Sequence, residues 1–368
     1  KNPLSLAFAI PDHPWVDAAD AAAVRIAMTV GSASTAPGRL LQVRAETASK
    51  NMQDEIEVRL TKKSGIIYSD LKLGINTSGV NLLRSNSNLS NRGVCLFGQG
   101  FVISKSEAKS IGLGLDQDLE QYIRHYRNGQ DITQISRNVM VIDLYGLTAE
   151  ETKIKFPAVY QWVLEKVKPE RDQNKRESRR KNWWLFGETN PKLRHQLKGL
   201  HRYIATVETP KHRTFQFLSH EILPDNMLVN IAVDDYFHLG ILSGRLHTVW
   251  ALATGGTLGA GQRYNKTRCF ETFPFPEANE TQKATIRELA ERLDAHRKRQ
   301  QEQHPDLTLT GMYNVLEKLR AEEPLTAKEK TIHEQGLVSV LRELHDDLDR
   351  AVFDAYGWND LAEQLVGL

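Results

Sequence analysis

The hydrophobic pattern changes along the chain, from strand-like runs near its start to helical spacing at its end. Residues 4–10 and 22–30 are short, nearly continuous apolar runs, which predict two buried strands in a hairpin-like pair. Apolar runs of similar length predict further strands at 138–144, 202–207, 214–218 and 227–233.

Helical spacing fills much of the rest of the sequence. Helices are expected at 105–126 and 148–168, one or two helices at 234–252, and a helical pattern from 281 onward. Thr148 and Glu151 have the spacing of a capping box at the start of the second of these helices. Strands mixed with helices and followed by a purely helical segment predict an α+β fold that ends in a helical bundle.

Charge divides the chain more sharply than its net value of +2 indicates. Residues 1–152 carry 16 basic and 16 acidic side chains, residues 153–276 carry 20 and 11, and residues 277–368 carry 12 and 19. A concentrated positive region beside an acidic one is typical of a surface that binds a polyanion. Solvated basic helices would give the same counts and are the alternative.

Composition narrows the class of protein. The chain is 40% hydrophobic and 26% charged, and it contains no apolar run long enough to span a membrane and no signal peptide. Cys95 and Cys269 have neither metal-ligand nor disulfide spacing, so a reducing cytoplasm is expected. The chain begins at Lys1 without an initiator Met, which suggests a fragment of a longer protein.

A glycine motif at residues 97–101 (FGQGF) is the first candidate for chemistry. It resembles the motif with which methyltransferases approach a nucleoside cofactor. A working site needs a helix directly after the glycines and an acidic residue about 20 positions later. The strand-like residues 101–103 follow instead, so a strand kink at glycine is the preferred interpretation and no cofactor-binding residue is expected.

Catalytic motifs are missing as well. Amino-methylating DNA methyltransferases hold a flipped base with an Asn/Asp-Pro-Pro-aromatic loop, and the nearest words, at 2–5 (NPLS) and 190–193 (NPKL), lack the second proline and the aromatic residue. No nuclease motif of paired acids followed by Lys is present, and the 12 histidines form no ligand cluster. The sequence therefore predicts no catalytic and no metal-binding residue.

Two basic segments are candidates for contacting a nucleic acid. The run 166–181 (KVKPERDQNKRESRRK) has eight basic and three acidic residues and leads into Trp183 and Trp184. The arginines are expected to contact phosphates and the tryptophans to lie in the core, with a solvated helix as the alternative. Residues 206–213 (TVETPKHR) hold a turn between two predicted strands that is tipped with three possible donors at 211–213, so it can enter a groove.

A glycine-rich loop at 254–268 is the third basic segment. Its four glycines let the backbone approach a partner closely, and its arginines, Asn265 and Lys266 offer donors to phosphates and base edges. A loop that cradles the phosphates of a nucleotide is the competing interpretation, but the Gly-Lys-Ser/Thr ending of such loops is missing.

Several long segments of the sequence resemble the fused type II restriction–modification methyltransferases (type IIG/IIL-like) and related phage-defence adenine methyltransferases. Residues 138–276 resemble their target-recognition region. The words include VIDLYGLT (141–148), WWLFGE (183–188), RYIATVET (202–209), FHLGILSGRLHTVW (237–250) and RYNKTRCFETFPFP (263–276). LHDDLDRAVFDAYGW (344–358) and FAIPDHPWVD (8–17) match too, so the resemblance covers nearly the whole chain.

The resemblance implies sequence-specific recognition of double-stranded DNA for an enzyme that methylates the N6 of a flipped adenine. S-adenosylmethionine and the catalytic loop would belong to an upstream methyltransferase domain of the same protein, and many relatives also carry a nuclease domain. The fragment alone would be inactive. Residues 1–50 would end a Rossmann-like methyltransferase sheet, 51–276 would form a mixed α/β target-recognition domain, and 277–368 a helical domain.

The resemblance also suggests residue roles. The segment between the two final catalytic strands lies near the flipped base in such enzymes, so His13 or Trp15 would line its pocket, unless Trp15 simply packs in a turn. The expected DNA contacts are Arg176, Arg179, Arg180, Lys181, Lys211, His212, Arg213, Arg245, Arg263, Tyr264, Asn265, Lys266 and Arg268.

Two other functions stay open. The first is a non-catalytic DNA-binding or specificity subunit that assembles with partners through its acidic helical tail. The second is RNA binding, which duplex-reading relatives make the weaker alternative.

Overall fold

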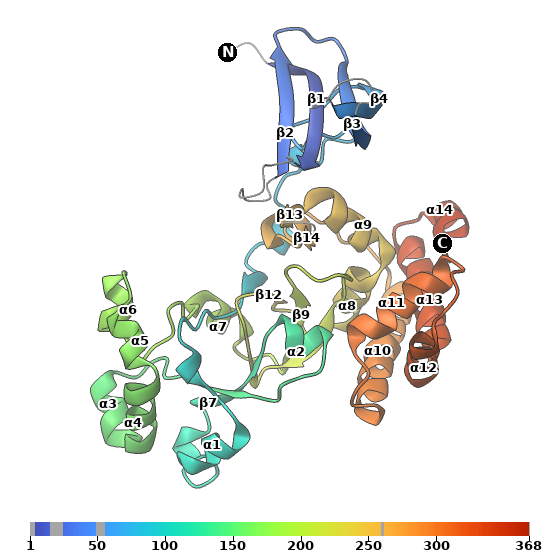
Figure 1. Ribbon diagram of the computed structural model, residues 1–368. Coiled ribbons are helices and arrows are strands. Elements are labelled where there is room, and N and C mark those ends of the chain that lie inside the picture. Colours follow the sequence, from blue (N-terminus) through green and yellow to red (C-terminus); the bar gives the residue numbers. More distant parts are fainter. Residues whose placement is uncertain (1–3, 15–24, 49–55, 259–260, 368) are drawn as a thin grey trace. The chain divides into compact units, whose positions relative to one another are not determined.

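The computed structural model describes residues 4–14, 25–48, 56–258 and 261–367 (Figure 1). The chain divides into two compact units, Lys1–Asn81 and Leu82–Leu368. In the described residues, no helix combines the length and the apolar character that crossing a bilayer requires.

The first unit is built on one four-stranded sheet in the order β2-β1-β3-β4. β1 is antiparallel to β2 and parallel to β3, and β3 is antiparallel to β4. Ala9, Leu40 and Ile67 form a small core on this sheet. The predicted pair of strands at the start of the chain is confirmed. The strands are β1 (Ser5–Pro14), β2 (Arg25–Ser32), β3 (Gly38–Ala48) and β4 (Ile56–Gly65).

Two small sheets organise the first half of the second unit. The central sheet has the order β10-β9-β12-β5 with antiparallel neighbours, and the other has the order β11-β7-β8-β6. The central strands are β5 (Ser90–Arg92), β9 (Arg202–Val207), β10 (Gln216–Ser219) and β12 (Leu228–Ile231). The others are β6 (Val102–Ile103), β7 (Ile123–Arg127), β8 (Met140–Ile142) and β11 (Ile222–Pro224).

Short helices cover the sheet that contains β8, and Phe101, Phe156, Val163 and Trp183 lie in their shared core. The helices up to residue 197 are α1 (Lys105–Ser110), α2 (Gly129–Thr133), α3 (Ala149–Lys155), α4 (Pro157–Lys166), α5 (Lys168–Asp172), α6 (Glu177–Lys181) and α7 (Pro191–Leu197). Single 3-10 turns occur at Thr77–Gly79, Arg84–Asn86, Gln99–Phe101 and Gln117–Leu119.

Helix α8 (Tyr236–Ser243) joins the central sheet to the C-terminal helices. Its Leu239 and Leu242 pack with the sheet, and its Phe237 and Ile241 pack with the helices. A Cβ on Gly240 would lie 2.6 Å from the Ile286 side chain, so only glycine allows this close approach to α10. The remaining helices are α9 (Arg245–Thr254), α10 (Glu280–Gln303), α11 (Leu309–Arg320), α12 (Ala327–Gly336), α13 (Val338–Ala355) and α14 (Asn359–Leu365).

Several predicted elements differ from the structure for local reasons. Most of 105–126 is not helical, because α1 ends before Gly112 and Gly114, which both have positive φ. The helix expected at 148–168 keeps its Thr148–Glu151 capping box but breaks at Pro157. The boundary expected at residue 50 falls between β3 and β4, which pair in one sheet.

The glycine motif at 97–101 is a turn rather than a kinked strand. Gln99–Phe101 form a 3-10 turn that leads directly into β6. A Cβ on Gly100 would collide with the carbonyl of Lys166, and the Trp162 indole donates a 2.9 Å hydrogen bond to the Gly100 carbonyl. Gly100 therefore allows close packing against α4.

One arginine of the basic run 166–181 is part of the core. Arg171 is 0% exposed, and its Nη2 donates hydrogen bonds of 2.8 Å to the carbonyls of Leu96 and Leu185. Its guanidinium carbon lies 5.6 Å from the Phe101 ring centroid, and burial lowers its pKa. Arg171 thus joins α5 to two segments that have no regular structure of their own.

We expect Arg171→Ala to lower the free energy of unfolding by about 3 kcal/mol, because the Leu96 and Leu185 carbonyls each lose a hydrogen bond and a cavity remains. Urea unfolding followed by tryptophan fluorescence would measure the loss. Arg176→Ala, in the same run but exposed, is the control and should change stability by less than about 0.5 kcal/mol. An unchanged urea midpoint in Arg171→Ala would mean that burying this cation costs as much as its hydrogen bonds contribute.

Candidate nucleic-acid interface

The turn after β9 is held in place from two sides. Backbone pairing of β9 with β10 and with β12 brings the chain to Glu208, whose N–H donates to the Met227 carbonyl at 2.8 Å. The Tyr264 N–H in turn donates to the Glu208 carbonyl at 2.7 Å. The turn and the loop after α9 are separate basic segments along the chain, but the fold brings them together.

Two of the three predicted donors on this turn reach the C-terminal helices. The Lys211 Nζ donates to the Asn314 Oδ1 at 2.7 Å and lies 3.7 Å from the Glu317 carboxylate. The His212 Nε2 is also 2.7 Å from the Asn314 Oδ1. Lys211 is exposed and His212 half-buried, so both stay accessible while α11 holds them.

The third donor, Arg213, turns inward. Its guanidinium hydrogen-bonds the Val207 carbonyl and the Thr206 Oγ1, and it lies 4.8 Å from the centroid of the Tyr264 ring. Burial lowers the pKa of Arg213 to about 10. Arg213 therefore fixes the turn from the protein side, and its contact with DNA stays a prediction.

Tyr264 likewise lies in the core, where it is 1% exposed. Its hydroxyl is 2.8 Å from the His247 Nε2, and burial raises the pKa of Tyr264 and lowers that of His247 to about 3. A neutral imidazole and a neutral phenol thus form a buried pair beneath the loop. Tyr264 supports the surface and cannot contact DNA directly in this conformation.

The glycine-rich loop contains a hairpin that the sequence pattern does not indicate. β13 (Gly256–Leu258) pairs with β14 (Gly261–Arg263), and residues 259–260 lie outside the described residues. The Arg263 Nε donates to the Glu208 carboxylate at 2.6 Å, and the Arg92 Nη2 lies 2.5 Å from the other oxygen of that carboxylate.

A π-helical turn at Lys266–Phe270 follows the hairpin. Asn265 caps it by accepting hydrogen bonds from the Thr267 N–H and hydroxyl, and Lys266 pairs with Glu271 at 2.7 Å. Arg268 points to solvent. Within this turn, Arg268 therefore has the exposure that a phosphate contact requires, whereas Asn265 and Lys266 also have structural partners.

The cations around α6 also form two groups, those that contact other parts of the protein and those that are exposed to solvent. The Arg179 guanidinium stacks 3.4 Å from the Phe97 ring centroid, and the Arg180 Nη1 donates to the Asn174 carbonyl at 2.5 Å. Arg176 and Lys181 are exposed, with Lys181 paired to Glu177 at 2.8 Å. Trp183 lies in the core and the Trp184 indole donates to the Leu147 carbonyl, so the predicted core position of both tryptophans is confirmed.

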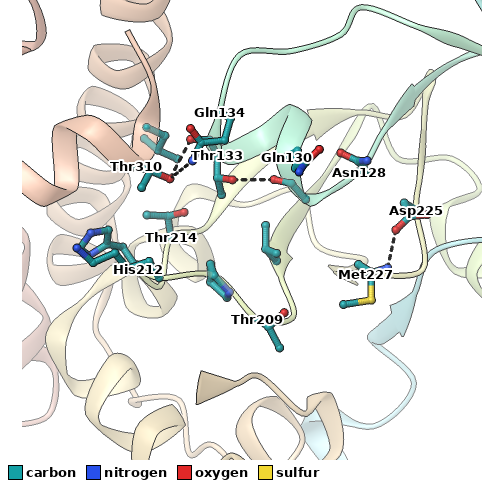
Figure 2. A pocket seen from close by; sticks show the side chains of 15 residues that line it. Asn128, Gln130, Thr133, Gln134, Thr209, His212, Thr214, Asp225, Met227 and Thr310 are labelled. Carbon is teal, nitrogen blue, oxygen red and sulfur yellow. Dashed lines mark hydrogen bonds between the residues drawn. The ribbon is translucent and has the colours of Figure 1, made fainter. Parts of the chain in front are cut away.

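Two clefts border the turn at 209–212. One, of about 570 Å³, is lined by this turn, the start of α2, Asp225, Met227 and Thr310 (Figure 2). The other, of about 550 Å³, lies toward α9, α11 and α13 and is lined by Arg245, Tyr313 and Asp349 among others. His212 lines both, so the turn separates the two clefts. Such a turn between hollows can approach a groove of a nucleic acid.

Arg245 lines the second cleft together with His212 and Arg213, which are also predicted contacts. Its N–H donates to the Asp349 Oδ1 at 2.6 Å, and its Nε is 3.7 Å from the Oδ2. Burial raises the pKa of Asp349 to about 6. Arg245 therefore joins α9 to α13 at the wall of the cleft.

The predicted base-pocket residues belong to the first unit. The His13 Nε2 lies 2.9 Å from the Glu46 Oε1, which links β1 to β3. Trp15 lies outside the described residues. Among the described residues, no group of three or more His, Cys, Asp or Glu side chains is arranged to hold a metal ion.

The sequence pattern gives no indication that Arg92 and Glu208 form an ion pair. Arg92 ends a three-residue strand, and Glu208 is separated from it by 116 positions. A contact over that distance along the chain leaves no periodic signal. The only local indication is an acidic residue at the base of an otherwise basic turn.

Three known proteins are similar to this chain to different extents. The type IIL restriction–modification enzyme MmeI, solved in complex with DNA, superimposes with a TM-score of 0.69 at 18% identity, over 99% of this chain and 45% of MmeI. The type IIG restriction endonuclease BpuSI gives a TM-score of only 0.34 at 10% identity, over 96% of this chain and 44% of that one. DNA methyltransferase A of Bacillus subtilis (strain 168) is 36% identical over 63 residues, 17% of this chain and 7% of that protein.

The chain thus spans less than half the length of each of these proteins. The fold it shares with MmeI is the mixed α/β arrangement of small sheets followed by C-terminal helices. The sequence model of the family "MmeI, target recognition domain" matches residues 87–277, which is more than half of the chain. The chain therefore belongs to the MmeI target recognition domain family.

Proposed function

We propose that this chain reads duplex DNA for a site-specific methyltransferase of a restriction–modification or phage-defence system. The family match over residues 87–277 is the observation that carries the proposal, and it contains the basic part of the chain. The exposed cations of this region come from separate segments, around α6, on the turn after β9 and on the π-helical turn. Phosphate contacts from several segments would fix the orientation of the duplex.

The chemistry would take place on residues outside this chain. The glycine motif at 97–101 leads into a strand instead of the helix that a nucleoside-binding site needs, and the sequence has no Asn/Asp-Pro-Pro-aromatic loop. We infer that S-adenosylmethionine binds to another part of the parent protein and that the methyl group goes to adenine N6. The words that resemble adenine methyltransferases support this, as does the partial identity to a DNA methyltransferase. A cytoplasmic location follows from the proposal.

Two exposed arginines are expected to contact phosphates. Arg176→Ala and Arg268→Ala should each weaken binding evenly across sequences and reduce the slope of log affinity against log salt by about 1, because each removes one phosphate contact. Gel-shift titrations of the 368-residue chain at several salt concentrations would measure both slopes. Arg299→Ala, an exposed arginine on α10, is the matched control and should leave the slope unchanged. Equal slopes in all three variants would refute this placement of the phosphates.

Methylation in cells tests the proposed reaction. Cells that carry the complete gene should contain N6-methyladenine within one short sequence motif, and a gene from which residues 87–277 are deleted should leave that motif unmethylated. Sequencing that detects modified bases would read both. DNA without N6-methyladenine, combined with sequence-specific binding by the chain, would favour the non-catalytic specificity subunit.

A further inference from the structure

The Glu208 carboxylate lies at the meeting point of three segments of the second unit. One oxygen accepts a 2.6 Å hydrogen bond from the Nε of Arg263 in β14. The other oxygen lies 2.5 Å from the Nη2 of Arg92 in β5. The Arg92 Nε also donates to the Asn226 carbonyl, just before β12, at 3.0 Å. One carboxylate therefore sets the position of two guanidinium groups that come from different strands.

The exposure of the three side chains is uneven. The Glu208 side chain is 5% exposed, whereas those of Arg92 and Arg263 are 44% and 39% exposed. The anion is thus buried and both cations are presented to solvent, with a net charge of +1 for the group. Two cations compensate the burial of one carboxylate, and the exposed parts of both guanidinium groups stay open to a partner.

The place of the group in the fold favours a role in recognition. Arg92, Val229 and Thr206 lie opposite one another across β5, β12 and β9, and Glu208 follows directly after β9. Val207 and Thr209, the neighbours of Glu208, line the cleft of about 570 Å³ in Figure 2. The two guanidinium groups therefore lie at the end of β9 from which the turn that separates the clefts begins.

We propose that Arg92 and Arg263 are a pair of base-reading arginines for guanines in the major groove, and that Glu208 is the residue that positions both. This inference rests on the proposed function. An arginine recognises guanine through two parallel hydrogen bonds to O6 and N7, which requires a fixed guanidinium plane. When the Nε of Arg263 binds the carboxylate, one N–H of each terminal nitrogen still points along the end of the guanidinium opposite to Nε, where two parallel hydrogen bonds can form. Two arginines on one carboxylate are close enough to contact neighbouring base pairs, which are about 3.4 Å apart.

The test begins with the unmodified 368-residue chain and a pool of DNA duplexes with randomised base pairs. Repeated selection gives the preferred duplex, and competition against a scrambled duplex gives a ratio of specific to non-specific affinity. Arg92→Lys and Arg263→Lys keep the charge but cannot form the two parallel hydrogen bonds. Each should lower the ratio on the order of 10-fold, with loss of preference at one G·C pair, and should reduce non-specific affinity far less.

Glu208→Gln distinguishes a role in orienting the two arginines from a purely structural role of the carboxylate. It should lower the ratio by a similar factor while raising non-specific affinity, because a negative charge near the phosphates is removed. A purely structural role would instead weaken both affinities together. Combining Glu208→Gln with Arg92→Lys should lose less than the product of the two single effects, since both changes release the same guanidinium.

Arg287→Lys is the matched control. Arg287 is 41% exposed and pairs with Asp235 through two hydrogen bonds of 2.9 Å, but it lies on α10 in the C-terminal helices. It should leave the ratio unchanged. If the unmodified chain selects a duplex and the Arg92, Arg263 and Glu208 variants select it equally well, this inference is wrong and the proposed function stands. If the unmodified chain selects no duplex, both are wrong.

Discussion

The second unit depends on a helix that is apolar on two sides. α8 places Leu239 and Leu242 against the central sheet and Phe237 and Ile241 against the C-terminal helices, and Gly240 removes the side chain that would keep α10 away. Arg297 of α10 strengthens the same junction from within, since its buried Nη2 donates to the Phe215 carbonyl at 2.8 Å. Sheet and helices therefore share one continuous interior, and the acidic tail is a structural neighbour of the basic surface.

Arginine has two distinct uses in this surface. Arg171, Arg179 and Arg213 direct their guanidinium groups inward, onto backbone carbonyls or aromatic rings, where they hold irregular segments together. Arg176 and Arg268 extend into solvent. Net charge alone does not distinguish the two groups. A positive segment thus contains both the cations that would meet a polyanion and those that shape the surface carrying them.

How far the sequence predicts the structure depends on the range of the interactions involved. β9 appears at the predicted residues 202–207, and the Thr148–Glu151 capping box forms as expected, because both depend on neighbouring positions. The glycine hairpin at 256–263 and the inward turn of Tyr264 do not follow from periodicity, since backbone pairing and packing from other segments decide them. The link from Arg92 to Glu208 spans 116 positions and is visible only once the sheet is assembled.

The attachment of the turn after β9 to α11 has an entropic consequence. Lys211 and His212 both contact the Asn314 side chain, and Arg213 hydrogen-bonds to the Val207 carbonyl at the start of the turn. A loop that is already ordered loses little conformational freedom when it meets a ligand, so more of its contact energy appears as affinity. Asn314, which lies on the far side of the turn in an acidic part of the chain, would therefore influence how tightly the opposite, basic surface binds without touching the ligand.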